Sequence, residues 1–252
     1  MNVTSWLSAG FFTFALSYIG MSAGGLFTFP FFKISTNMSQ RLVMISVGVL
    51  ISILLLEVLP ESVSLGGLPQ ALLGSSIGYI SARLSDLVLH RWSKRNSPLF
   101  IEASDHSNIW LISAMALHNL PVGLAIGTGL KGSQLQPVHE HLTITMIFHS
   151  IPEGLALGML FISLGYRLPS LLFTYGLINV PILIGAALGY RLDESLNPFT
   201  ISLLISIAIG TLMFVIIHEM LLPIKKQFGW KSSLLCFSIG ASAGNVILIF
   251  TS

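Results

Sequence analysis

Residues 111–130 read LISAMALHNLPVGLAIGTGL, twenty positions without a single Asp, Glu, Lys or Arg. A membrane-spanning helix needs about 20 mostly apolar residues, so this stretch is long enough to cross a bilayer. Similar runs recur along the chain of 252 residues, of which 53% are hydrophobic and only 9% charged. Soluble domains carry about 25% charged residues. The composition therefore predicts an integral membrane protein rather than a soluble enzyme.

Working outward from this stretch, we expect an all-α integral membrane protein with eight transmembrane helices, forming a single polytopic membrane domain over residues 1–252. The runs are continuously apolar, unlike the short alternating strands of a membrane barrel. The longest connection, 90–108, is charged and rich in turn residues, so we expect it to be a solvated loop. The predicted spans are 6–32, 42–60, 68–89, 109–130, 139–163, 169–190, 198–222 and 232–251.

The distribution of Lys and Arg predicts the orientation of these spans. One set of alternate loops and flanks holds ten basic residues, and the other holds only Lys131 and Arg191. Because cytoplasmic loops carry the excess of positive charge, the 90–108 loop is expected in the cytoplasm and both termini outside. Short loops without a His-rich tract favour a bacterial cell membrane. The net charge of +2 is too small to suggest a nucleic-acid partner, which leaves membrane lipid and a possible homodimer.

Two neighbouring spans carry the same motif. HNLPVGLAIG at 118–127 and HSIPEGLALG at 149–158 are identical at six of ten positions. His118 lies about 9 residues into its span and His149 about 10, which places both roughly 13–15 Å deep, near the membrane midplane. Glu153 follows His149 by four residues and shares its helix face.

Ionisable groups at this depth are costly and normally mark an ion or substrate path. A lone buried histidine is often an interhelical hydrogen-bonding group, but a matched pair with a carboxylate favours a metal site. Two imidazoles and one carboxylate suit Zn²⁺, and also Fe²⁺, Mn²⁺, Co²⁺ or Cd²⁺, as a transported substrate rather than a cofactor. Because neutral imidazole is the ligand form, uptake should weaken as pH falls through the range in which histidine is protonated.

Small residues recur four apart in three of the spans. Such faces let two helices approach closely, so we interpret them as packing surfaces of a compact bundle. The pairs are Gly74 with Gly78, Gly185 with Gly189, and Gly240 with Gly244.

With these residues in place, the sequence resembles the ZIP metal transporters. HNLPVG and HSIPEG resemble the paired metal-site motifs of that family's fourth and fifth helices, and EVLPES at 57–62 and HEMLLP at 218–223 resemble the ends of its second and seventh. The resemblance covers the whole chain. It implies a ZIP-like bundle, with helices 1–3 and 6–8 as inverted repeats around helices 4–5, and import of Zn²⁺ or a related divalent metal into the cytosol.

The resemblance also implies a ligand set. Its primary metal site maps onto His118, His149 and Glu153, and Asn119 follows the first histidine as in the family. The chain departs from the family at three positions, where an acidic or acid-like residue is replaced. They are Val122, Ser150 and Asn179. Only Glu153 is charged, so we expect one bound metal rather than two adjacent ones.

Three further polar residues fit a transport path. Glu57, toward the outer end of the second span, fits an entry position, whereas Glu61 is interpreted as a solvated interfacial acid. His218 and Glu219, toward the cytoplasmic end of the seventh span, fit an exit relay, with interfacial hydrogen bonding as the alternative.

Two other functions remain open at this point. An intramembrane metal-dependent hydrolase also buries His and acidic residues, but its HExxH signature is incomplete, because HEMLL at 218–222 ends in Leu222. A non-transporting metal sensor is the third class. Metal flux into vesicles separates these functions.

Overall fold

A computed structural model describes residues 5–32, 36–96, 103–130, 136–192, 196–222 and 229–251. These residues are almost entirely helical, and no strand occurs among them. The elements are α1 (Trp6–Phe32), α2 (Thr36–Ile53), η1 (Leu54–Val58), α3 (Leu59–Gly66), α4 (Leu68–Asn96), α5 (Ala103–Gly129), α6 (Gln136–Ser163), α7 (Leu168–Leu192), α8 (Pro198–Val215), η3 (Ile216–Leu221) and α10 (Trp230–Thr251).

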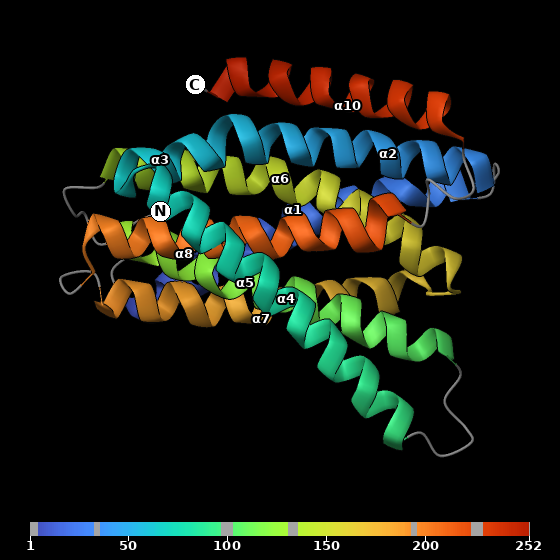
Figure 1. Cartoon of the computed structure of the whole chain (residues 1–252), viewed down its shortest axis with the longest axis horizontal. Helices are drawn as coiled ribbons and strands as arrows, with labels where there is room; N and C mark the ends of the chain where they lie inside the picture. Colours follow the sequence, from blue (N-terminus) through green and yellow to red (C-terminus); the bar gives the residue numbers. More distant parts are fainter. Residues whose placement is uncertain are drawn as a thin grey trace.

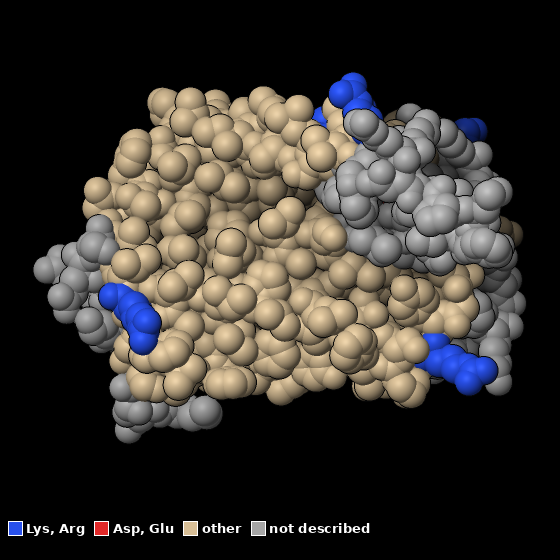
Figure 2. All heavy atoms as spheres, turned by 90° about the horizontal axis from the view of Figure 1, so that it is seen from below, with Lys and Arg blue, Asp and Glu red and all other residues tan. Residues whose placement is uncertain are grey.

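Most helices run side by side along the long axis of the molecule, as Figure 1 shows. α4 crosses the bundle obliquely, and α10 lies at one edge against α2. Among the described residues that Figure 2 shows on this face, the surface is broadly uncharged, with Lys and Arg near its margins and no Asp or Glu in view. An uncharged belt of this kind is the surface that a bilayer core requires.

By length and composition, seven described segments could cross a membrane, so the chain is a multi-pass membrane protein. They are Trp6–Thr28, Asn37–Gly66, Leu111–Gly129, Thr145–Ser163, Leu168–Leu192, Pro198–Leu221 and Trp230–Ile249. The predicted span 68–89 is helical within α4 but is absent from this set. Its apolar residues are diluted by serines and by the Arg83–Asp86 ion pair of 3.0 Å. The eighth crossing therefore stays a prediction.

The helices extend into the predicted 90–108 loop. α4 continues to Asn96 and α5 begins at Ala103, while 97–102 lie outside the described residues. A helix satisfies its own backbone hydrogen bonds in water as well as in lipid, so the end of an apolar run does not have to end the helix. The end of hydrophobicity predicts the membrane boundary rather than the helix boundary.

Two π-helical turns interrupt the regular helices. In η1 the N–H of Leu59 bonds the carbonyl of Leu54, and after η3 the N–H of Leu222 bonds that of Ile217. The sequence places Pro60 shortly after the first turn and Pro223 shortly after the second. A proline removes an N–H from the helical ladder, and π turns frequently mark functional sites. Here they contain Glu57, His218 and Glu219.

The predicted glycine faces are helix crossings, which confirms their interpretation. Gly74 and Gly78 face α8, Gly185 and Gly189 face α5, and Gly240 and Gly244 face α2. A Cβ at Gly240 would lie 2.8 Å from the carbonyl carbon of Ile45. α2 and α10 therefore meet backbone to backbone at this point.

This contact predicts that Gly240→Ala destabilises the fold by about 1–3 kcal/mol, because the added methyl overpacks the crossing. Gly176→Ala is the matched control, since a Cβ there would have its nearest neighbour, Tyr18 Cε2, at 3.9 Å. Thermal unfolding of the detergent-purified variants measures the difference. A melting temperature for Gly240→Ala equal to or above that of Gly176→Ala would contradict the packing argument.

Candidate metal site

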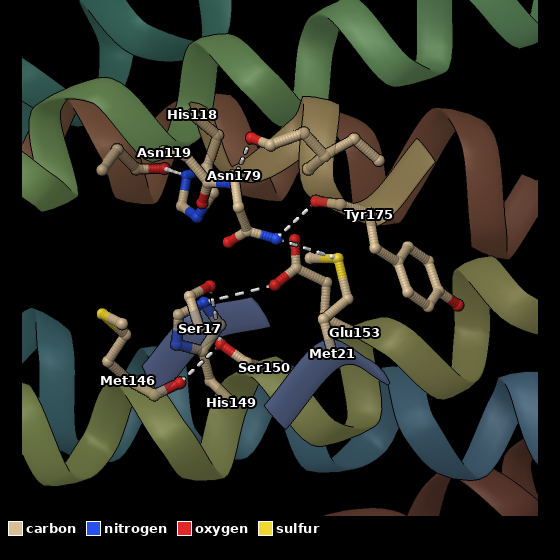
Figure 3. A network of polar contacts seen from close by, with 12 residues as sticks. Ser17, Met21, His118, Asn119, Met146, His149, Ser150, Glu153, Tyr175 and Asn179 are labelled. Atoms are coloured by element: carbon tan, nitrogen blue, oxygen red, sulfur yellow. Dashed lines mark hydrogen bonds and ion pairs between the residues drawn. The ribbon is translucent and has the colours of Figure 1, made fainter. Parts of the chain in front are cut away.

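Three helices carry the polar residues in the centre of the bundle. α5 supplies His118 and Asn119, and α7 supplies Asn179. α6 supplies His149, Ser150 and Glu153. Figure 3 shows these side chains facing a common space between the helices. Glu153 and Asn179 have no exposed surface, and His118 is 2% exposed.

A backbone carbonyl of α8 fixes the ring of His118. Its Nδ1 donates to the carbonyl oxygen of Ala208 at 3.0 Å, and the Thr211 hydroxyl donates to the same oxygen at 2.9 Å. When Nδ1 carries the proton, Nε2 of a neutral imidazole is left with a lone pair. This arrangement, in which one ring nitrogen bonds a carbonyl and the other is free, is typical of metal-ligating histidines.

His149 lies opposite His118 and next to the carboxylate. The two rings are edge to face, with centroids 6.1 Å apart. His149 Nε2 lies 3.5 Å from Glu153 Oε2, one helical turn away. Among the described residues, no three His, Cys, Asp or Glu side chains are grouped closely enough to hold a metal. His149 and Glu153 thus form a close pair, and His118 faces them from α5.

The three amide and hydroxyl residues have different surroundings. Asn119 donates to the carbonyl of Ile178 at 2.9 Å and so ties α5 to α7. Ser150 donates to the Met146 carbonyl at 2.7 Å. Asn179 donates to the carbonyl of Tyr175 at 2.8 Å, which leaves its Oδ1 without a partner. Asn179 is therefore the one of the three whose oxygen is free to accept.

Five side-chain atoms around this space are buried without a hydrogen-bond partner, and all five are acceptors when both imidazoles carry their proton on Nδ1 and Glu153 is ionised. They are His118 Nε2, His149 Nε2, Glu153 Oε1, Glu153 Oε2 and Asn179 Oδ1. Buried polar atoms are paired in the great majority of cases, because an unpaired one loses the hydrogen bonds it made to water. A cluster of acceptors without an accompanying donor is chemically suited to a cation.

A cavity of about 50 Å³ adjoins the two histidines. Its wall is mostly aliphatic, and its polar lining residues are His118, His149 and Thr145. Thr145 lies one turn before His149 on α6, and its hydroxyl donates to the carboxylate of Glu57 in η1. Glu57, predicted at an entry position, is thus linked through one hydroxyl to the cavity beside the histidines.

The residues predicted for the exit lie in η3, apart from this network. The His218 ring stacks on Phe214 at a centroid distance of 4.3 Å and meets Tyr79 of α4 edge to face at 6.0 Å. Glu219 follows in the same π turn. Their exit role stays a prediction.

Several residues at the site were missed by sequence reasoning. Thr145 could have been found, because it is four residues from His149 and shares its helix face. Tyr175 has the same spacing from Asn179 on α7. The Ala208 carbonyl, Thr211 and Met21 carry no comparable signal, since they reach the site only through helix crossings.

The fold and the central cluster define a multi-pass helical membrane protein with a buried, acceptor-rich core. The family model of the ZIP zinc transporters matches residues 100–250, more than half of the chain. The chain therefore belongs to the ZIP zinc transporter family, whose members are transporters rather than enzymes, and divalent metal transport follows from this membership. Comparison with curated proteins finds no match.

The contact between Glu57 and Thr145 predicts that Glu57→Gln weakens metal capture. Removing the negative charge that contacts Thr145 of the cavity wall should raise the KM for Zn²⁺ uptake into proteoliposomes by about tenfold, equivalent to about 1.4 kcal/mol. Glu61→Gln, four residues later, is the matched control and should leave the KM unchanged. Equal KM values for the two variants would exclude Glu57 from the entry path.

Proposed function

We propose that this protein carries a divalent transition metal, Zn²⁺ foremost, across the membrane into the cytoplasm. The metal is bound at the membrane midplane by His118, His149 and Glu153, with Asn119 and Asn179 beside them. Fe²⁺, Mn²⁺, Co²⁺ and Cd²⁺ are the related substrates that the same donors accept. The physiological partners are the metal ion and membrane lipid, with no nucleic acid.

The observation that carries this proposal is the cluster of five unpartnered acceptors. Two imidazole nitrogens and a carboxylate are the donor types that Zn²⁺ takes in proteins. The carbonyl of Ala208 holds the His118 ring, and the backbone of Thr145 is a hydrogen-bonding partner of the His149 ring. In the described conformation His149 and Glu153 form the close pair, and His118 would have to approach them to complete a three-ligand site.

The proposed path runs along the bundle by alternating access. Metal enters past Glu57, reaches the midplane site, and leaves past His218 and Glu219. Ser150 lines the path next to His149. The arrangement has eight crossings, with helices 1–3 and 6–8 as inverted repeats around the two central helices. Two neutral imidazoles and one carboxylate leave a net charge of +1 on the loaded site, which favours release.

The alternative functions lack support from the described site. A hydrolase of the HExxH type needs a second histidine one turn after the first, and Leu222 occupies that position. A sensor would bind metal without flux, so the two are separated by transport measurements.

The decisive experiment compares metal uptake by purified protein in liposomes. His149→Ala and Glu153→Ala should each reduce Zn²⁺ uptake by at least about tenfold, because each removes a donor from a site with few. Asp86→Ala is the matched control, since Asp86 is a partly exposed acid paired with Arg83. Size-exclusion and thermal unfolding profiles verify that the variants are folded. Normal uptake by folded Glu153→Ala would refute the site.

The proposed orientation is tested by cysteine labelling in intact cells of a bacterial expression host. An impermeant thiol reagent added outside should label Ser133→Cys but leave Ser97→Cys unlabelled, because the basic flanks place 90–108 in the cytoplasm. The native Cys236 is buried and provides the background. Labelling of Ser97→Cys alone would reverse the orientation.

A further inference from the structure

A methionine sulfur lies beside the carboxylate of the site. Met21 of α1 is fully buried, and its Sδ accepts the amide N–H of Asn179 at 3.5 Å. Figure 3 shows the thioether next to Glu153, with the two histidines on the other side of the carboxylate. No motif in the sequence marks this residue, and the ligand set derived above does not include it.

The position of Met21 is fixed by its backbone. α1 and α6 cross at Gly154, where an added Cβ would come within 2.7 Å of the Met21 Cα. The Tyr175 hydroxyl donates to the Gly154 carbonyl at 2.5 Å and holds α7 against the same crossing. Because Gly154 is adjacent to Glu153 in sequence, this contact brings the backbone of Met21 close to the helix turn that carries Glu153, and the Met21 sulfur contacts Asn179 of the same cluster.

The Met21 sulfur differs in chemical type from the other metal donors proposed for the site. Glu153 is the only acid in the cluster, and Asn179 contributes a neutral oxygen. A thioether is a soft, polarisable donor with no charge. Soft donors select softer metals, whereas Mn²⁺ and Mg²⁺ prefer carboxylate, carbonyl and water oxygens.

We propose that Met21 is a specificity-determining residue, whose thioether adds a soft donor to the midplane site and biases it toward Zn²⁺ and Cd²⁺ over Mn²⁺. This inference rests on the proposed transport function. It differs from a packing role, in which any buried apolar side chain of similar volume would serve equally well.

The direct test is X-ray absorption spectroscopy of purified protein loaded with Cd²⁺ in detergent. The wild-type protein should show a sulfur scatterer in the first coordination shell, and Met21→Leu should lose it while retaining the nitrogen and oxygen scatterers. Met159→Leu is the matched control, because Met159 is 2% exposed and lies in the same apolar core as Met21, whereas it is the sulfur of Met21 that contacts Asn179. A wild-type spectrum without sulfur, or sulfur that persists in Met21→Leu, would overturn the proposal.

Transport selectivity supplies the second test. In proteoliposomes supplied with Cd²⁺ or Mn²⁺, Met21→Leu should lower the Cd²⁺-to-Mn²⁺ uptake ratio about tenfold, equivalent to about 1.4 kcal/mol. Met21→Gln, of similar length but with an oxygen donor, should lower the ratio further and remains informative if the leucine variant fails to fold. An unchanged ratio in the folded variants, with Glu153→Ala inactive, would refute the role of Met21 and leave the transport function intact. Absence of uptake by the wild-type protein would instead refute the transport function.

Discussion

In the hydrocarbon core of a membrane every backbone N–H and C=O must find a partner within the protein, and this constraint shapes each part of the structure. Helices satisfy it along most of the chain, and glycine crossings bring them into backbone contact, as at Gly154 and Gly240. At the two π turns the hydrogen-bond spacing changes, but the N–H groups of Leu59 and Leu222 still donate to a carbonyl of the same helix. Polar side chains then remain as the groups whose pairing is incomplete.

The central cluster follows from the same constraint. The carbonyl oxygen of Ala208 accepts a hydrogen bond from Nδ1 of His118, and the carbonyl oxygen of Tyr175 accepts one from the side-chain amide of Asn179. In each case the donor of the side chain is paired, and its other polar atom, Nε2 of His118 or Oδ1 of Asn179, is left without a partner. The backbone carbonyls that bind these donors therefore shape the central cluster as much as the identity of its polar residues does. For the proposed site, substitutions at Ala208 or Thr211 of α8 should alter metal binding without replacing a proposed ligand residue.

Much of this arrangement is predictable from sequence. The apolar runs predict eight spans, and seven described segments have the length and composition of a span. The repeated His-x-x-Pro-x-Gly unit marks the two helices whose histidine rings lie with centroids 6.1 Å apart. The predicted span 68–89 within α4 is not among these seven, because its polar residues dilute its apolar signal. Met21 and Thr211 could not be predicted, since their proximity to Asn179 and His118 depends on crossing points between helices far apart in sequence. The sequence signal for the π turns is a proline shortly after each of them, Pro60 and Pro223.

The small aliphatic cavity beside His118 and His149 has a consequence for the rate of the proposed transport. A volume of about 50 Å³ accommodates only a few water molecules, so the cavity cannot hold a cation together with six waters. On the proposed path, the speed at which an ion loses water would then contribute to its selection. Mg²⁺ releases water reluctantly, and the aliphatic wall supplies few oxygens to replace that shell. On the proposed metal path, the narrow cavity would therefore disfavour Mg²⁺ at the step at which the ion loses its water.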